Sequence, residues 1–125
     1  VEGWVDKVAL RGHLETTAVG VLPLRDTFFN RNITSPLKLF DYFGHGIPVI
    51  AADLPTLREL VDDGVTGVFH VPGDADDLAR ALDELWSQES LRTRMAGNIY
   101  RECGKYLWSE RAKRLAEFIR STKGS

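Results

Sequence analysis

Lys38 and Asp41 are the residues whose types and spacing most directly suggest chemistry. They lie three apart in the segment 33–53, which reads ITSPLKLFDYFGHGIPVIAAD. Residues three apart on a helix share a face, and the unpaired N–H groups at a helix start attract anions. A cation near that start and a carboxylate one turn deeper suit a nucleotide diphosphate and its ribose. A plain Lys38–Asp41 pair on a solvated helix face is the alternative.

The flanking residues predict a helix followed by a buried strand. Ser35 is expected to cap the helix and Pro36 to be its first residue, where a missing N–H costs nothing. The helix is expected to end at Gly44, with Gly46 in a left-handed conformation. The apolar run 49–52 then predicts a short buried strand. The anion site would consist of backbone N–H groups at the helix start, those of Ser35, Leu37 and Lys38.

The rest of the chain alternates between strand and helix patterns. Further strands are predicted at 1–5, 18–24 and 68–71. Further helices are predicted at 7–17, 55–61, 75–86, 90–100 and 109–121. The nearly continuous apolar run 18–24 is typical of a strand covered on both faces by helices. These patterns predict an α/β fold with a parallel sheet of about four short strands flanked by helices.

A polar loop, RDTFFNRNIT at 25–34, follows the predicted strand 18–24. Loops at the carboxyl ends of parallel strands are where ligands bind. Candidate phosphate or sugar contacts in this loop are Arg25, Asn30, Arg31 and Asn32. A solvated surface loop is the alternative reading. Phe28 and Phe29 are expected to anchor the loop against the body of the protein.

Composition narrows the class of protein. A chain of 125 residues with a net charge of −2 suits one globular domain and gives no sign of general nucleic-acid binding. Cys103 is the only cysteine, which excludes an intrachain disulfide. No apolar run approaches the roughly 20 residues that span a bilayer, and no signal peptide opens the chain. The start at Val1, without methionine, suggests a fragment.

Other chemical patterns have simpler explanations. Asp74-Ala75-Asp76 spells the D-x-D of metal-dependent transferases, but it opens a predicted helix, where acids are stabilising. Asp74 is expected to be the N-cap. Gly44-His45-Gly46 ends a helix, so it is no dinucleotide fingerprint. The histidines and the cysteine lack metal-ligand spacing. His70, Trp86 and Trp108 are interpreted as packing residues.

The segment S-P-L-K-L-F-D-Y-F-G-H-G-I-P-V-I-A resembles the S-P-x-K-x-F-E-Y-x-A-x-G-x-P-V-V-A signature of family 4 (group 1) retaining glycosyltransferases, which have the GT-B fold. VEGWVD and AVGVLPL are similar to two preceding strands of that family. LRELVDDGVTGVFHVPGDADDLARAL is similar to its following segment. Together these segments cover residues 1–82, in the family's order.

The resemblance implies the donor-binding, C-terminal half of a GT-B enzyme, with a Rossmann-like sheet. Residues 1–125 would form a single, partial domain that binds a nucleotide-diphosphate sugar without a metal or other cofactor. The activity would be hexosyl transfer in glycan biosynthesis, in the cytoplasm or at its membrane face, and the fragment alone would be inactive. The implied donor-binding residues are Ser35, Pro36, Leu37, Lys38, Asp41, Arg25, Arg31, Asn32 and Glu59. An ordinary surface acid is the alternative for Glu59.

Two departures from the family pattern shape these expectations. The family carries E-x7-E, and here the two acidic positions hold Ile33 and the shorter Asp41. Two family strands that would lie between the strands 1–5 and 18–24 are also missing. We therefore expect an open sheet edge, covered by the rest of a parent enzyme or by a second copy. The alternatives are a non-catalytic nucleotide-sugar-binding or scaffold domain and a GT-B nucleotide-sugar epimerase.

Overall fold

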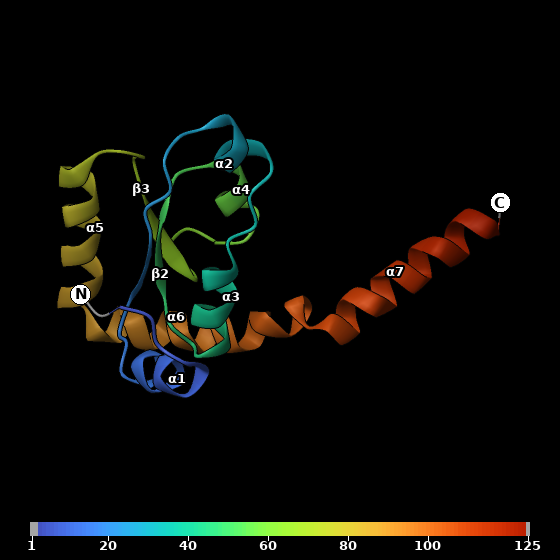
Figure 1. The fold of residues 1–125 in the computed structure, drawn as a ribbon, viewed down its shortest axis with the longest axis horizontal. Coiled ribbons are helices and arrows are strands. Elements are labelled where there is room, and N and C mark those ends of the chain that lie inside the picture. Colours follow the sequence, from blue (N-terminus) through green and yellow to red (C-terminus); the bar gives the residue numbers. More distant parts are fainter. Residues whose placement is uncertain (1–2, 125) are drawn as a thin grey trace.

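The computed structural model describes residues 3–124 and contains a small parallel sheet wrapped by helices (Figure 1). The strands are β1 (Gly20–Leu22), β2 (Val49–Ala52) and β3 (Gly67–His70). The helices are α1 (Lys7–Glu15), α2 (Phe28–Asn32), α3 (Leu37–Gly44), α4 (Pro55–Arg58), α5 (Ala75–Ser87), α6 (Glu89–Glu102), the 3₁₀ turn η1 (Cys103–Tyr106) and α7 (Trp108–Lys123).

The sheet has the order β1-β2-β3, and both pairings are parallel. This arrangement confirms the predicted α/β class. The prediction of about four strands was wrong for the part of the chain that the structure describes, where there are three. The expected strand 1–5 falls partly on residues 1–2, which lie outside the described range. Residues 3–5 form no strand, because no neighbouring strand is present beside them to complete a ladder.

The core lies on both faces of β2, whose four residues are all buried. One cluster packs α3, α4 and α6 against the sheet, and it includes Leu39, Phe43, Leu57 and Ile99. The other packs α5 and α6 on the opposite face through Ile50, Val68, Leu85 and Met95. Each fully buried aliphatic side chain contributes about 1.5–3 kcal/mol. Truncating Leu85, which is fully buried, to alanine would cost about 2–5 kcal/mol.

The predicted central helix forms, but its start differs from the prediction. Pro36 has an extended conformation, with ψ at 112°, and is itself the N-cap. The helix therefore begins at Leu37, and no side chain, including that of Ser35, makes a capping hydrogen bond. The other end agrees with prediction, because Gly46 takes a left-handed conformation with φ at 67°. The chain thereby turns directly from α3 into β2.

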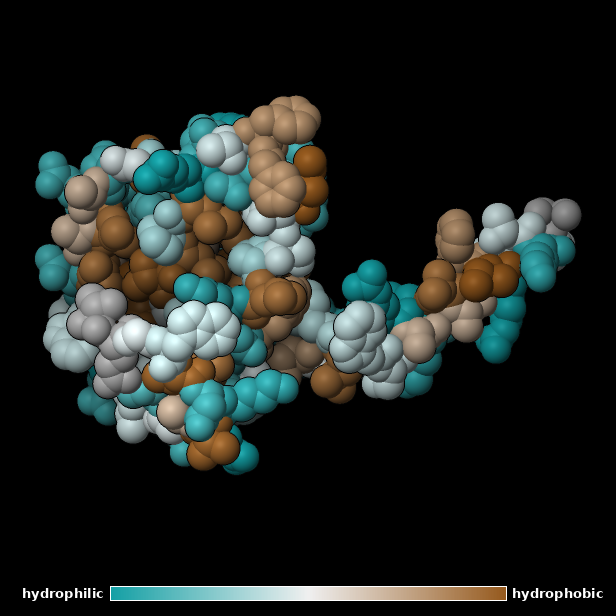
Figure 2. Space-filling view, viewed as in Figure 1, coloured by the Kyte–Doolittle hydropathy of each residue, from teal (hydrophilic) through white to brown (hydrophobic). Residues whose placement is uncertain are grey.

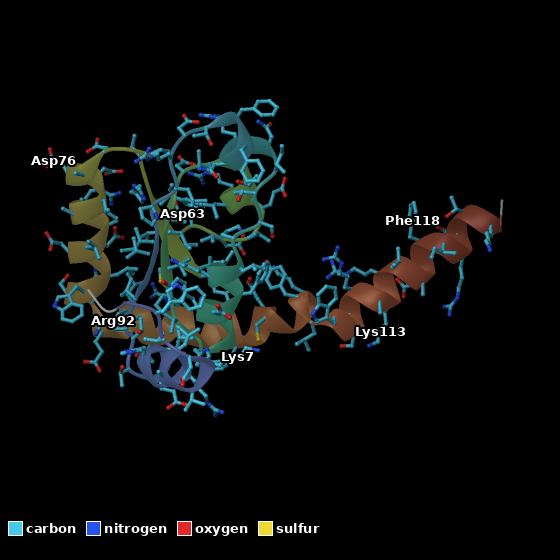
Figure 3. The ribbon with its side chains drawn as sticks, in the orientation of Figure 1. Lys7, Asp63, Asp76, Arg92, Lys113 and Phe118 are labelled. Carbon is cyan, nitrogen blue, oxygen red and sulfur yellow. The ribbon has the colours of Figure 1, made fainter. Side chains whose placement is uncertain are left out.

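The C-terminal helix extends away from the sheet (Figure 1). The predicted helix 109–121 was expected to pack through Ala112, Leu115, Phe118 and Ile119, yet no residue of α7 is buried. Phe118 lies on the projecting part of the helix, far from the body (Figure 3). Trp86 and Trp108 were also predicted to pack, and both are exposed. These predictions were wrong because apolar side chains on one face of a helix are buried only where another helix or strand packs against that face.

Candidate site at the carboxyl edge of the sheet

The start of α3 lies at the carboxyl edge of the sheet. Strand β1 ends at this edge, and β2 runs parallel to it and therefore starts at the opposite, amino edge. Helix α3 ends just before β2, so it runs back across the sheet and begins near the end of β1. The chain thus places a helix N-terminus where ligands bind in parallel α/β folds.

Lys38 and Asp41 occupy the first two turns of α3, and both are exposed. Within residues 3–124 no ion pair joins them or involves either side chain. The alternative of a simple surface pair is therefore not what the structure contains. The Asp41 backbone carbonyl accepts a hydrogen bond from Nδ1 of His45 at 2.9 Å, which leaves the carboxylate open to solvent.

The predicted polar loop contains the short helix α2, which the sequence pattern did not reveal. Thr27 caps it by accepting a hydrogen bond from the Asn30 N–H at 3.1 Å. Arg31 forms a two-pronged ion pair with Asp26, with Nη2 at 2.9 Å from Oδ2. These hydrogen bonds lower the pKa of Asp26 and raise that of Arg31. The ion pair offsets the charge of Arg31, whereas exposed Arg25 has no carboxylate partner among the described residues.

The two asparagines of the loop bind backbone atoms. The Asn30 side chain donates to the carbonyl of Arg25 at 2.8 Å, and the Asn32 side chain donates to that of Phe28 at 2.8 Å. Both side-chain amides therefore stabilise the local conformation. The Thr56 hydroxyl donates to the carbonyl of Asn30 and ties α2 to α4.

Glu59 is exposed and follows the last residue of α4. A nearby charged pair escaped the sequence analysis: Arg58 Nε lies 2.6 Å from Oδ1 of Asp53, the residue after β2. The hydrogen bonds from Arg58 lower the pKa of Asp53. The Arg58 guanidinium also lies over the ring of Phe69, 4.2 Å from its centroid. The sequence analysis missed this pair because a spacing of five residues across a turn matches neither helix nor strand periodicity.

Phe28 and Phe29 do not anchor the loop, contrary to the prediction. Their exposed fractions are 76% and 56%, and Ile33 is 60% exposed beside them. Helix α2 is one and a half turns long, so it can bury only a narrow stripe. A hydrogen bond from the Thr56 hydroxyl to the Asn30 carbonyl instead joins it to α4.

Other possible binding features lie elsewhere or are missing. A hollow of about 470 Å³ lies at the amino edge, lined in part by Thr17, Ile47, Pro48 and Tyr100. It is thus remote from the start of α3. Residues 3–124 contain no group of three or more His, Cys, Asp or Glu side chains arranged to hold a metal ion. None of the described helices combines the length and apolar character required for a membrane crossing.

A parallel α/β domain with a helix start at its carboxyl edge is the architecture in which folds of this class place their ligand sites. The chain superposes on sucrose-phosphate synthase from Thermosynechococcus elongatus with a TM-score of 0.78 and 22% identity, over 98% of this chain and 30% of that one. Anabaena HepE, solved in complex with UDP, gives a TM-score of 0.67 and 18% identity over 87% and 29%. These likenesses confirm a partial, Rossmann-like half of a GT-B fold.

The sequence comparisons identify the family. A D-inositol 3-phosphate glycosyltransferase of Streptosporangium roseum is 36% identical over 72 residues, which are 58% of this chain and 17% of that protein. A chitobiosyldiphosphodolichol beta-mannosyltransferase of Candida albicans is 33% identical over 61 residues, 47% and 13% of the two chains. The chain thus spans less than a fifth of these relatives. The family model "Glycosyl transferases group 1" matches residues 1–88, and the chain belongs to this family.

Proposed function

We propose that this chain is the donor-binding half of a retaining glycosyltransferase, which moves a sugar from a nucleotide-diphosphate sugar to an acceptor hydroxyl. One observation carries the proposal: α3 starts at the carboxyl edge with Lys38 and Asp41 exposed and without ion-pair partners in the described part of the chain. Membership of the glycosyltransferase family supports it. No metal or other cofactor is part of the proposal.

In this proposal the diphosphate lies against the start of α3. The N–H groups there and the Lys38 ammonium stabilise its negative charge, and Arg25 adds a second cation. Asp41 accepts hydrogen bonds from the ribose hydroxyls. During transfer the bond between the sugar and the diphosphate oxygen breaks, and the acceptor oxygen bonds to the same carbon. The nucleoside diphosphate leaves with the electron pair, and the acceptor proton passes to it or to water.

Calorimetric titration of the chain with UDP, GDP and ADP tests the proposal. UDP is the first choice, because the similar HepE structure was solved with it. Asp41→Ala should weaken binding of the selected nucleotide by about 1–3 kcal/mol, since a charge-assisted hydrogen bond is lost. Asp83→Ala, which removes another exposed helical carboxylate, should leave affinity unchanged. Equal affinities for both variants and the unmodified chain would contradict the proposal.

Lys38→Ala tests the cation separately. It should weaken binding of a nucleoside diphosphate more than binding of the nucleoside, because its partner is the diphosphate. Lys7→Ala is the matched control, since Lys7 is likewise exposed in the first turn of a helix. Equal losses for diphosphate and nucleoside would argue against this role.

A specific observation favours a second candidate, a non-catalytic nucleotide-sugar-binding domain. Ile33 stands eight residues before Asp41, where the resembling family has an acid, and its side chain is 60% exposed without any polar atom. In either case the chain would act as one partial domain completed by the rest of a parent protein, at a cytoplasmic location. Nucleotide binding without sugar transfer in the parent would select the second candidate.

A further inference from the structure

Helix α2 is held in place by hydrogen bonds and not by hydrophobic packing. None of its residues is buried, and its apolar side chains project into solvent (Figure 2). Because the helix buries no side chain, its hydrogen bonds to the rest of the molecule determine where the loop 25–34 lies. Two of these bonds form a path from the core to Arg25, the cation that the proposed function places beside the diphosphate.

The path begins at Thr56, in a part of the chain that is fixed in the core. Thr56 lies in α4 between Leu54 and Leu57, which are both fully buried. Protein cores are close-packed, so the backbone of α4 cannot shift here without disturbing its neighbours. The Thr56 hydroxyl donates a hydrogen bond to the Asn30 carbonyl in α2. This bond therefore joins the loop to a rigid point of the molecule.

Asn30 continues the path to the backbone of Arg25. The Asn30 side-chain amide donates to the Arg25 carbonyl at 2.8 Å, and the same carbonyl accepts a hydrogen bond from the Thr27 N–H at 3.0 Å. On the other side of Arg25, Leu24 packs against the hydrophobic cluster that contains Leu39 of α3. The Arg25 backbone is thus held from both sides, and its exposed side chain extends from a fixed position.

The charge of Arg25 makes this fixed position relevant to the donor. Arg31 is ion-paired with Asp26, whereas Arg25 forms no ion pair within residues 3–124. Lys38 directly precedes Leu39, so both cations extend from the same hydrophobic cluster. A cation whose backbone is already ordered loses less conformational freedom when it binds an anion, and this strengthens binding.

On the basis of the proposed function, we propose that Asn30 and Thr56 are positioning residues for the donor diphosphate. They touch neither the phosphates nor the sugar. They hold the Arg25 backbone so that the guanidinium is directed at the diphosphate beside the start of α3. The sequence suggested Asn30 as a direct phosphate or sugar contact, and in this proposal its role is indirect. Both residues act only through Arg25.

The test is calorimetric titration of the chain with UDP and with uridine, or with the matching guanosine or adenosine pair where the donor titration selects that base. Asn30→Ala should weaken UDP binding by about threefold to tenfold, the range that one hydrogen bond covers. Uridine binding should be unchanged, because Arg25 meets only the diphosphate. Asn98→Ala is the matched control, since the half-buried Asn98 amide also donates to a backbone carbonyl, that of Val65, at 2.9 Å. It should change neither affinity.

Two substitutions of Thr56 separate positioning from a general loss of structure. Thr56→Val keeps the shape of the side chain but removes the hydroxyl, and it should weaken UDP binding by a similar factor. Thr56→Ser keeps the hydroxyl, and it should retain the affinity of the unmodified chain. Circular dichroism of each variant checks that the fold is retained.

A double-mutant cycle with Arg25→Ala tests the path itself. Asn30→Ala should add no further loss of UDP affinity to that of Arg25→Ala, because it acts through Arg25. A full additional loss in the double variant would overturn the positioning role.

The outcomes distinguish this proposal from the proposed function. UDP binding that depends on Arg25 but is unaffected by Asn30→Ala and Thr56→Val would overturn the positioning role and leave the donor site intact. UDP binding that Arg25→Ala does not weaken would likewise overturn the positioning role alone. Absence of binding of every nucleotide to the unmodified chain would overturn the donor site and the positioning role together.

Discussion

The ring of Tyr42 lies against the backbone of Gly20 so closely that a Cβ atom on Gly20 would stand 2.5 Å from Cδ2 of the ring. Through this contact α3 packs directly against β1. Since α3 carries Lys38 and Asp41 on its first two turns, the absence of a side chain at Gly20 determines how closely the candidate site approaches the sheet.

Replacing Gly20 with alanine should therefore destabilise the protein and displace α3. We expect a loss of about 1–3 kcal/mol in unfolding free energy, as for other overpacked cores, measured by urea denaturation. Gly12→Ala is the control, because nothing lies within 4 Å of its added Cβ in the middle of α1. That change should stabilise the helix by up to about 1 kcal/mol. Equal effects of the two substitutions would contradict the role of the Tyr42 contact.

The tether from Thr56 to α2 predicts a local effect. Thr56→Val removes the hydroxyl that donates to the Asn30 carbonyl and keeps the side-chain shape. Hydrogen exchange in α2 should become faster by about fivefold, since one net hydrogen bond is worth about 1 kcal/mol. Thr93→Val, at an exposed position on α6, should change nothing there. Unaltered exchange in α2 would contradict a stabilising role of the Thr56 hydroxyl.

Acid should weaken the contact between Asp53 and Arg58. The folded state lowers the pKa of Asp53 through the hydrogen bonds from Arg58, so the contribution to stability is complete above about pH 4. It disappears as the pH falls through the lowered folded-state value. Both side chains are nearly half exposed, so solvent screening limits the contribution to about 1 kcal/mol or less.

Asp53→Asn should therefore cost a small amount of stability at pH 7 and nothing further near pH 2. Urea denaturation from pH 2 to pH 7 would measure this as a shallower pH dependence than that of the unmodified chain. Asp83→Asn should leave the pH dependence intact, because Asp83 has no ion pair in the described structure. If the free energy of unfolding depended on pH in the same way in Asp53→Asn and in the unmodified chain, the stabilising contact between Asp53 and Arg58 would be refuted.

The start of α5 provides a test of capping. The Asp74 carboxylate accepts a hydrogen bond from the Asp77 N–H at 3.0 Å, so Asp74→Ala should cost about 0.5–2 kcal/mol. Asp76→Ala removes a carboxylate from the same turn but no capping bond, and it should cost only about 0.3–1 kcal/mol. Thermal unfolding of both variants compares them. A larger loss for Asp76→Ala would contradict the assignment of the cap.

The predictions from the sequence were most accurate where residues close together in the chain determine the local structure. Strand β2 is a buried apolar run, Gly46 supplies the turn that leads into it, and Asp74 caps α5, all as expected. The α/β class and the family likeness followed from the order of such elements. The start of α3 was missed by one residue, because proline can serve either as the first helical residue or as an extended N-cap.

Features that depend on distant contacts were not predictable. The Asp26–Arg31 and Asp53–Arg58 pairs span five residues across turns, a spacing with no periodic signal. The apolar residues of α2 and α7 resemble packing stripes, and only the placement of neighbouring elements determines whether they are covered. Of the predicted donor residues, Arg31 and Asn32 are held by local bonds, whereas Lys38 and Asp41 remain open to solvent.

The outer side of β1 has a practical consequence for handling the isolated chain. Gly20 bonds towards β2, and in a parallel strand the groups of alternate residues point to opposite sides, so the N–H and C=O of Val21 face outward. Unpaired groups of this kind can pair with the edge of another chain. The isolated chain should therefore associate through this edge at high concentration, and Val21→Lys should reduce the association seen by sedimentation.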